Sequence, residues 1–163
     1  MRKDLEQQLL RELLKNSKRS DRELAKVLKV SQPTLTRTRQ RLEKNGMIED
    51  YTIVPNFQKM GFEILALTFV KMRSDILIGE TREKARKFAT TFPNVIFASS
   101  GDGLGMTGVI ISFHRNYTEY HNQLSKMRIE LKDVIDGIQN FVVPIGEGEY
   151  KRFSLSHLKD VPL

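Results

Sequence analysis

The sequence predicts an α+β fold in two parts, with three short helices in the first part and a βαββαβ unit in the second. Leucines at helical spacing and helix-capping residues fill the first 50 residues, which indicates helices. Segments rich in β-branched and aromatic residues then alternate with two helical stripes. Charge divides the chain at the same place, because residues 1–50 hold 13 Lys/Arg and 8 Asp/Glu, whereas residues 51–163 hold 14 and 12. Most of the net charge of +7 therefore lies in the helical part, which is the better candidate to contact a polyanion.

The first two helices are marked by leucine spacing and by a cap. Leucines recur at helical intervals over about residues 3–15, and the polar residues 16–19 end that helix. Ser20 and Glu23 then have the spacing of a capping box, in which a hydroxyl and a carboxylate each bond the other residue's backbone. The second helix should run to about Lys29.

The third helix completes a helix-turn-helix. Ser31 is its expected N-cap, Pro33 suits its first turn, and Asn45-Gly46 should end it. Leu35 and Leu42 are seven residues apart and therefore share the buried face. Two short helices joined by a tight turn are typical of this motif.

Polar side chains should occupy the outward face of the third helix. Arg pairs with guanine and Gln with adenine, while Thr contacts phosphate or the thymine methyl group. The predicted DNA-binding residues are Ser31, Gln32, Thr34, Thr36, Arg37, Gln40 and Arg41. The alternative is a solvated basic helix on a scaffold, and the capped helix pair before it favours DNA.

A short wing strand is expected after the third helix, because residues 47–54 alternate loosely and contain β-formers. The first domain is therefore a winged helix-turn-helix over residues 1–54. Residues 55–61 are expected to form a linker, and residues 62–163 the second domain.

The second domain has the order of a ferredoxin-like βαββαβ sandwich. The expected strands and helices are, in order, strand 62–72, helix 79–92, strand 95–99, strand 106–113, a helix capped by Asn116 and strand 138–145. Helices cover only one face of such a sheet, so the other face is expected to pair with a second sheet in a homodimer. Residues 150–158 alternate imperfectly and are a candidate for one more strand.

An ordered set of short segments runs through nearly the whole chain. The segments are 20–25, 30–37, 41–48, 55–61, Gly101-Asp102 and Val161-Pro162-Leu163. No single segment is specific, but the ordered set resembles the leucine-responsive and asparagine-regulator family (Lrp/AsnC, or feast/famine) of bacterial and archaeal transcription regulators.

This resemblance implies partners and a second site. The third helix should enter the major groove of double-stranded DNA, and the second domains should pair into dimers, with tetramers or octameric rings as further states. An amino acid or related small effector should bind near the loop between the second and third strands. The expected effector-binding residues are Ser100, Gly101, Asp102, Gly103 and Leu104. Asp102 taken alone is equally compatible with a simple turn.

Three residues depart from the family pattern. Lys29 stands where many helix-turn-helix units have Gly, and Arg39 stands where a buried aliphatic residue is usual, so that face should be wetter. Leu104 stands where many members carry a second acidic residue, which removes one carboxylate partner of an effector's ammonium group.

No cofactor or catalytic residue is expected. Residues 103–108 satisfy G-x-G-x-x-G, but a strand-like stretch follows them instead of the helix that would bind a pyrophosphate. His114, His121 and His157 are interpreted as surface or interface residues and not as zinc ligands. The basic run of residues 82–87 is interpreted as the solvated face of an amphipathic helix.

The sequence also lacks signals for export or membrane insertion. It has no cysteine, its N-terminus has no apolar segment, and the apolar run 64–70 is too short to span a bilayer. A cytoplasmic protein without a membrane partner is expected.

The leading hypothesis is a sequence-specific DNA-binding transcription regulator modulated by a small effector, and not an enzyme. A nucleoid-like architectural DNA-binding protein is the first alternative. A haem-precursor decarboxylase of the same architecture is the second, and it would need His and Arg side chains around a tetrapyrrole. Only His114 and His121 lie within the βαββαβ core.

Overall fold

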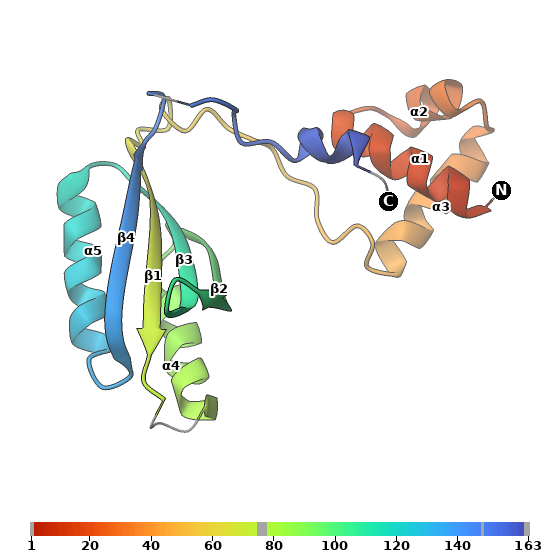
Figure 1. The fold of residues 1–163 in the computed structure, drawn as a ribbon. Coiled ribbons are helices and arrows are strands. Elements are labelled where there is room, and N and C mark those ends of the chain that lie inside the picture. The colour runs from red at the N-terminus through yellow and green to blue at the C-terminus, as the bar shows by residue number, and fades with distance from the viewer. Residues whose placement is uncertain (1, 75–77, 148, 162–163) are drawn as a thin grey trace. The chain divides into compact units, whose positions relative to one another are not determined.

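The protein has two compact units, and the computed structural model describes residues 2–74, 78–147 and 149–161 (Figure 1). Met1–Val54 and Lys151–Leu163 form the first unit, and Pro55–Tyr150 form the second. Residues 62–163 were expected to form one domain, but the segment after Tyr150 belongs to the first unit. Pro162-Leu163, the end of the expected closing motif, lies outside the described residues.

Three helices pack around a leucine core in the first unit. They are α1 (Arg2–Lys15), α2 (Asp21–Leu28) and α3 (Gln32–Lys44). The core consists of Leu9, Leu13, Leu24, Ala25, Leu35 and Leu42. The expected capping box is confirmed, because the Ser20 amide donates to Glu23 Oε2 over 2.8 Å and the Glu23 amide donates to Ser20 Oγ over 3.3 Å.

The turn between α2 and α3 depends on a left-handed residue. Lys29 adopts φ 54° and ψ 43°, a conformation in which a side chain is strained and glycine is not. The Val30 amide then donates to the Ala25 carbonyl over 3.0 Å and closes the end of α2. The departure from Gly at position 29 therefore leaves the turn geometry intact but adds backbone strain.

The expected wing strand over residues 47–54 is wrong. The described part of the first unit contains no strand, so the β-formers of this stretch have no ladder to join. The amides of Met47 and Ile48 both donate to the Leu42 carbonyl and end α3. Ile48 packs on the leucine core, but Ile53 is 80% exposed.

The extra strand expected in the tail is also wrong. Residues Leu155–Asp160 form a 3₁₀ helix, η1, which packs against α1 (blue in Figure 1). Ser154 caps η1, because its hydroxyl accepts a hydrogen bond from the Ser156 amide over 3.2 Å. The local cap and the contact with α1 outweigh the imperfect alternation of the sequence.

The second unit confirms the expected βαββαβ order. Its elements are β1 (Ile64–Met72), α4 (Ile78–Thr91), β2 (Val95–Gly103), β3 (Met106–His114), α5 (Tyr117–Glu130) and β4 (Ile135–Pro144). The strands form one antiparallel sheet in the order β2-β3-β1-β4, which is the ferredoxin-like arrangement. β2 extends four residues beyond the expected end at residue 99.

One face of this sheet is covered and the other is open. Val70 of β1 packs with Phe88 of α4 and Met127 of α5, so both helices cover the same face. On the opposite face Leu67 lies in register between Ile111 of β3 and Phe141 of β4. Phe141 is 63% exposed. The single chain therefore leaves an apolar sheet face in solvent.

Candidate nucleic-acid interface and effector segment

The outward face of α3 presents most of the predicted DNA-binding side chains. Ser31, Gln32, Thr34, Arg37 and Gln40 are exposed, whereas Leu35 and Leu42 are buried. Ser31 is the N-cap, since its hydroxyl accepts from the Thr34 amide over 3.3 Å and lies 2.8 Å from the Thr34 hydroxyl. Within the described residues, the side chains of Gln32, Arg37 and Gln40 have no polar partner.

The other two predicted residues, Thr36 and Arg41, are bonded inside the unit. The Thr36 hydroxyl donates to Asp21 Oδ2 over 2.7 Å, which ties α3 to the start of α2. Arg41 Nε lies 2.5 Å from Glu6 Oε1, which ties α3 to α1. Both side chains are half-buried. In this arrangement they position α3, and each would have to leave its carboxylate to reach DNA.

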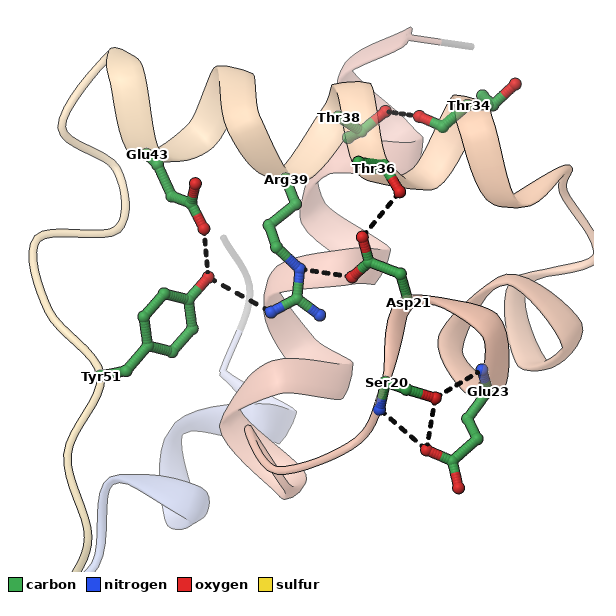
Figure 2. A network of polar contacts seen from close by, with 9 residues as sticks. All are labelled: Ser20, Asp21, Glu23, Thr34, Thr36, Thr38, Arg39, Glu43 and Tyr51. Carbon is green, nitrogen blue, oxygen red and sulfur yellow. Dashed lines mark hydrogen bonds and ion pairs between the residues drawn. The ribbon is translucent and has the colours of Figure 1, made fainter.

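Arg39 is the centre of a polar network that the sequence analysis missed. Its Nε lies 2.7 Å from Asp21 Oδ1, and its Nη1 lies 3.4 Å from the Tyr51 hydroxyl (Figure 2). The guanidinium carbon is 5.8 Å from the centre of the Tyr51 ring. Tyr51 donates in turn to Glu43 Oε1 over 2.8 Å. The face expected to be wetter is instead closed by an ion pair and an aromatic ring.

Burial and the network both affect the pKa of the Tyr51 phenol. Burial raises the pKa of the Tyr51 phenol, and the hydrogen bond to Glu43 acts in the same direction. Arg39 opposes both effects. The phenol therefore stays protonated and donates to Glu43. One signal could have predicted the network, namely an acidic and a basic residue, Asp21 and Arg39, at positions that both face inward.

Several carboxylates of the first unit are paired inside it, which leaves the exposed cations unbalanced. Asp21 is paired with Arg39 and Glu6 with Arg41. Glu12 is also paired, because Arg19 Nη2 donates to Glu12 Oε2 over 2.6 Å. Hydrogen bonding from Lys15 lowers the pKa of Glu12, so that this carboxylate is ionised. The described part of this unit has eight exposed cations without an ion pair, namely Lys18, Arg22, Lys26, Lys29, Arg37, Lys44, Lys151 and Arg152. This distribution suits a phosphate backbone.

The expected effector segment forms the end of β2 and a hairpin turn. Ser100, Gly101 and Asp102 are exposed on β2, and Gly103 pairs with Met106 across a two-residue turn. Leu104 and Gly105 form that turn with φ 55° and 70°. A strand follows, so the glycine-rich stretch is a hairpin and not a dinucleotide loop, as expected. The assignment of these five residues to an effector stays a prediction.

His114 differs from its expected place at a surface or interface. It is only 1% exposed, with Nε2 2.8 Å from Ser112 Oγ and Nδ1 3.3 Å from Asn94 Nδ2. His121 and His157 are exposed. Within the described residues, no three His, Asp or Glu side chains are grouped to hold a metal ion. A histidine enclosed in this way does not fit a role facing a tetrapyrrole.

Comparison with known proteins first shows which class of domain the N-terminal helices form. Residues 2–49 match the family model for winged helix-turn-helix DNA-binding domains, and this is the segment that forms α1 to α3.

The described part of the chain has no helix that is both long and apolar enough to cross a membrane.

Relatives then define the family. The chain is 34% identical to the HTH-type transcriptional regulator LrpA of Pyrococcus abyssi over 94 residues, which are 58% of this chain and 64% of that protein. It is 34% identical to LrpA of Pyrococcus horikoshii over 98 residues, which are 60% of this chain and 67% of that protein. The chain thus aligns with slightly less than two thirds of the first relative and about two thirds of the second. It belongs to the Lrp/AsnC family of transcription regulators.

Solved structures of other proteins show the same fold. An AsnC family transcriptional regulator from Agrobacterium tumefaciens has a TM-score of 0.79 at 17% identity and covers 92% of both chains. The regulator NMB0573 of Neisseria meningitidis, solved as a complex with L-Met, has a TM-score of 0.77 at 16% identity. That match covers 94% of this chain and 97% of the other.

Proposed function

We propose that this protein is a sequence-specific DNA-binding transcription regulator whose α3 enters the major groove. The main support is that Gln32, Arg37 and Gln40 are exposed on α3 and have no polar partner among the described residues, while the nearby carboxylates Asp21 and Glu6 are bonded inside the unit. A major groove admits a helix of this kind and is read by Arg and Gln side chains. The names of the LrpA relatives support the same reading.

Each side chain has a proposed role. Arg37 contacts a guanine through two hydrogen bonds, and Gln32 and Gln40 contact adenines. Ser31 and Thr34 lie at the N-terminus of α3, where hydroxyls and free backbone amides suit a phosphate. Thr36 and Arg41 hold α3 in place through their carboxylate partners and so position the other side chains.

A homodimer is the proposed functional unit. The open sheet face around Leu67, Ile111 and Phe141 is apolar and needs cover. The same face of a second copy would cover it and form a two-fold symmetric dimer. The two α3 helices of such a dimer would bind half-sites about one DNA turn, or a multiple of it, apart. Tetramers or octamers would extend the same assembly.

A small effector is proposed to act at residues 100–104. The relative NMB0573 was solved with L-Met, and the hairpin formed by these residues is exposed in the single chain. Asp102 supplies one carboxylate for an ammonium group, and Leu104 supplies none. Because the proposed partner is DNA, the cytoplasm is the proposed location of the protein.

The test is selection of bound DNA from random genomic fragments, followed by titration with salt. A shared palindromic motif, with affinity that falls as salt rises, is the expected result. Tight binding without a motif would replace the proposal with the architectural alternative. No binding at low salt, with or without L-methionine, would overturn it.

A further inference from the structure

A hollow of about 640 Å³ lies between α4 and the helix-facing side of β2. Its size is within the range of sites that bind small molecules. It lies within one chain, and it shares only Ser100 with the hairpin segment discussed above.

Small residues create this hollow. The strand register pairs Ala98 with Ile110 and Ser100 with Gly108, so these small residues line the helix-facing side of the sheet edge. Ala85 and Ala89 face them from α4. Protein interiors normally contain few voids larger than a water molecule, so a space of this size between a helix and a sheet suits an occupant.

The chemistry of the wall indicates what would fit. Phe88, Ile110 and Leu131 make the interior apolar. Arg82 and Arg86 also line the hollow, whereas no Asp or Glu among the described residues does so. Arg86 is bonded to Glu83 over 3.0 and 3.2 Å, but Arg82 has no polar partner among the described residues. The hydroxyl of Ser100 is equally free within the described chain.

We infer that this hollow binds a hydrophobic monocarboxylic acid. The apolar body packs between Phe88 and Ile110, and the carboxylate bonds Arg82. A ligand with an added ammonium group binds less well, because no carboxylate of the described residues lines the hollow to replace the hydration that the ammonium group loses. The inference concerns the free protein and does not require that it bind DNA.

The test is calorimetric titration of the full chain with three matched probes. These are 3-phenylpropanoate, its neutral amide, and L-phenylalanine, which adds an ammonium group to the same skeleton. We expect saturable binding of 3-phenylpropanoate with a Kd of about 1 mM or tighter. The amide and the amino acid should each bind about tenfold more weakly or worse. Equal or tighter binding of L-phenylalanine would overturn the ligand class.

Variants test the location. Arg82→Gln should weaken binding of 3-phenylpropanoate about tenfold and leave the amide unchanged. Lys84→Gln removes a cation from the same helix but outside the hollow, and should change neither. Ala98→Leu should fill the hollow and abolish binding, with thermal unfolding as the check that the chain folds.

Unchanged affinity in both Arg82→Gln and Ala98→Leu would overturn the site, as would no saturable heat with 3-phenylpropanoate up to about 10 mM. DNA binding measured on the same samples reports the proposed function separately.

Discussion

The Nε2 atom of His114 lies 2.8 Å from the hydroxyl oxygen of Ser112, and both side chains are buried on the helix-facing side of β3. Asn94 contacts the other ring nitrogen, and the imidazole and the Tyr120 ring make a T-shaped contact with centroids 5.3 Å apart. Burial lowers the pKa of His114, although Glu119 opposes that effect. The imidazole is therefore neutral in the folded protein and charges more readily in the unfolded chain.

Stability should fall below about pH 6.5 because of this histidine. Its folded-state pKa is lowered, so the unfolded chain binds the proton first, and stability is lost as pH falls from the unfolded pKa towards the folded one. Urea unfolding at about pH 7.5 and about pH 5.5 measures this effect. The free energy of unfolding should fall less between the two pH values in His114→Gln than in the parent. His121→Gln, at an exposed site, is the control. Equal pH slopes in parent and His114→Gln would contradict this account.

Arg39→Met should destabilise the first unit. The substitution leaves Asp21 half-buried with only the Thr36 hydroxyl as a partner, at a cost of about 1–3 kcal/mol in the free energy of unfolding. The double variant Arg39→Met/Asp21→Asn should recover part of this loss, because it removes the uncompensated charge. Additive losses in a double-mutant cycle by urea unfolding would show that the pair is not coupled.

Lys29→Gly should stabilise the protein. The left-handed conformation of Lys29 brings its Cβ close to a backbone carbonyl oxygen, and glycine has no Cβ. The substitution should therefore raise the free energy of unfolding by about 1 kcal/mol. Lys26→Gly is the matched control, because it places glycine inside α2 and should cost about 1 kcal/mol. Thermal unfolding measures both, and a loss of stability in Lys29→Gly would mean that the strain is not present.

Arg37→Ala should weaken binding to the selected DNA motif by about 1–3 kcal/mol and relax the preference at one base pair. Arg37 is exposed on α3 and has no polar partner within the described chain, so its loss should act on DNA contacts and leave stability unchanged. Fluorescence anisotropy on the motif and on single-base variants measures both effects. Arg128→Ala, exposed on α5, is the control. Unchanged affinity and unchanged preference would remove Arg37 from the reading surface.

Phe141→Lys should convert a dimer to a monomer. The side chain lies beside Leu67 on the open face of the sheet, so a charge there would be buried without a partner in the dimer. Light scattering after size exclusion measures the mass. Ile129→Lys replaces an exposed apolar residue of α5 and should leave the mass unchanged. A dimer that survives Phe141→Lys would place the contact elsewhere.

Local signals predicted much of the fold. Ser20, Ser31 and Asn116 each cap the helix that the sequence assigned to them, because a cap depends on residues within one turn. The strand prediction for residues 150–158 failed for the opposite reason, because η1 is stabilised by contact with α1 at the other end of the sequence. Leu155 and Leu158 are three residues apart, and this helical spacing was the available signal.

The candidate interface was predictable only in part. The burial of Leu35 and Leu42 fixed which side of α3 faces out, and Gln32, Arg37 and Gln40 followed from it. The bond from Arg41 to Glu6 joins residues 35 apart, so no local pattern reports it. The hollow beside β2 was equally hidden, because it arises from the register of Ala98 and Ser100 against β3.

The packing of η1 on α1 has a consequence for synthesis on the ribosome. The three helices of the first unit emerge early, but η1 follows the whole of the second unit in the chain. The nascent chain therefore exposes the surface of α1 that η1 covers until translation has passed residue 160. Since domains generally fold in the order in which they emerge, the helix-turn-helix should form first and acquire its last contact only after the sheet is complete.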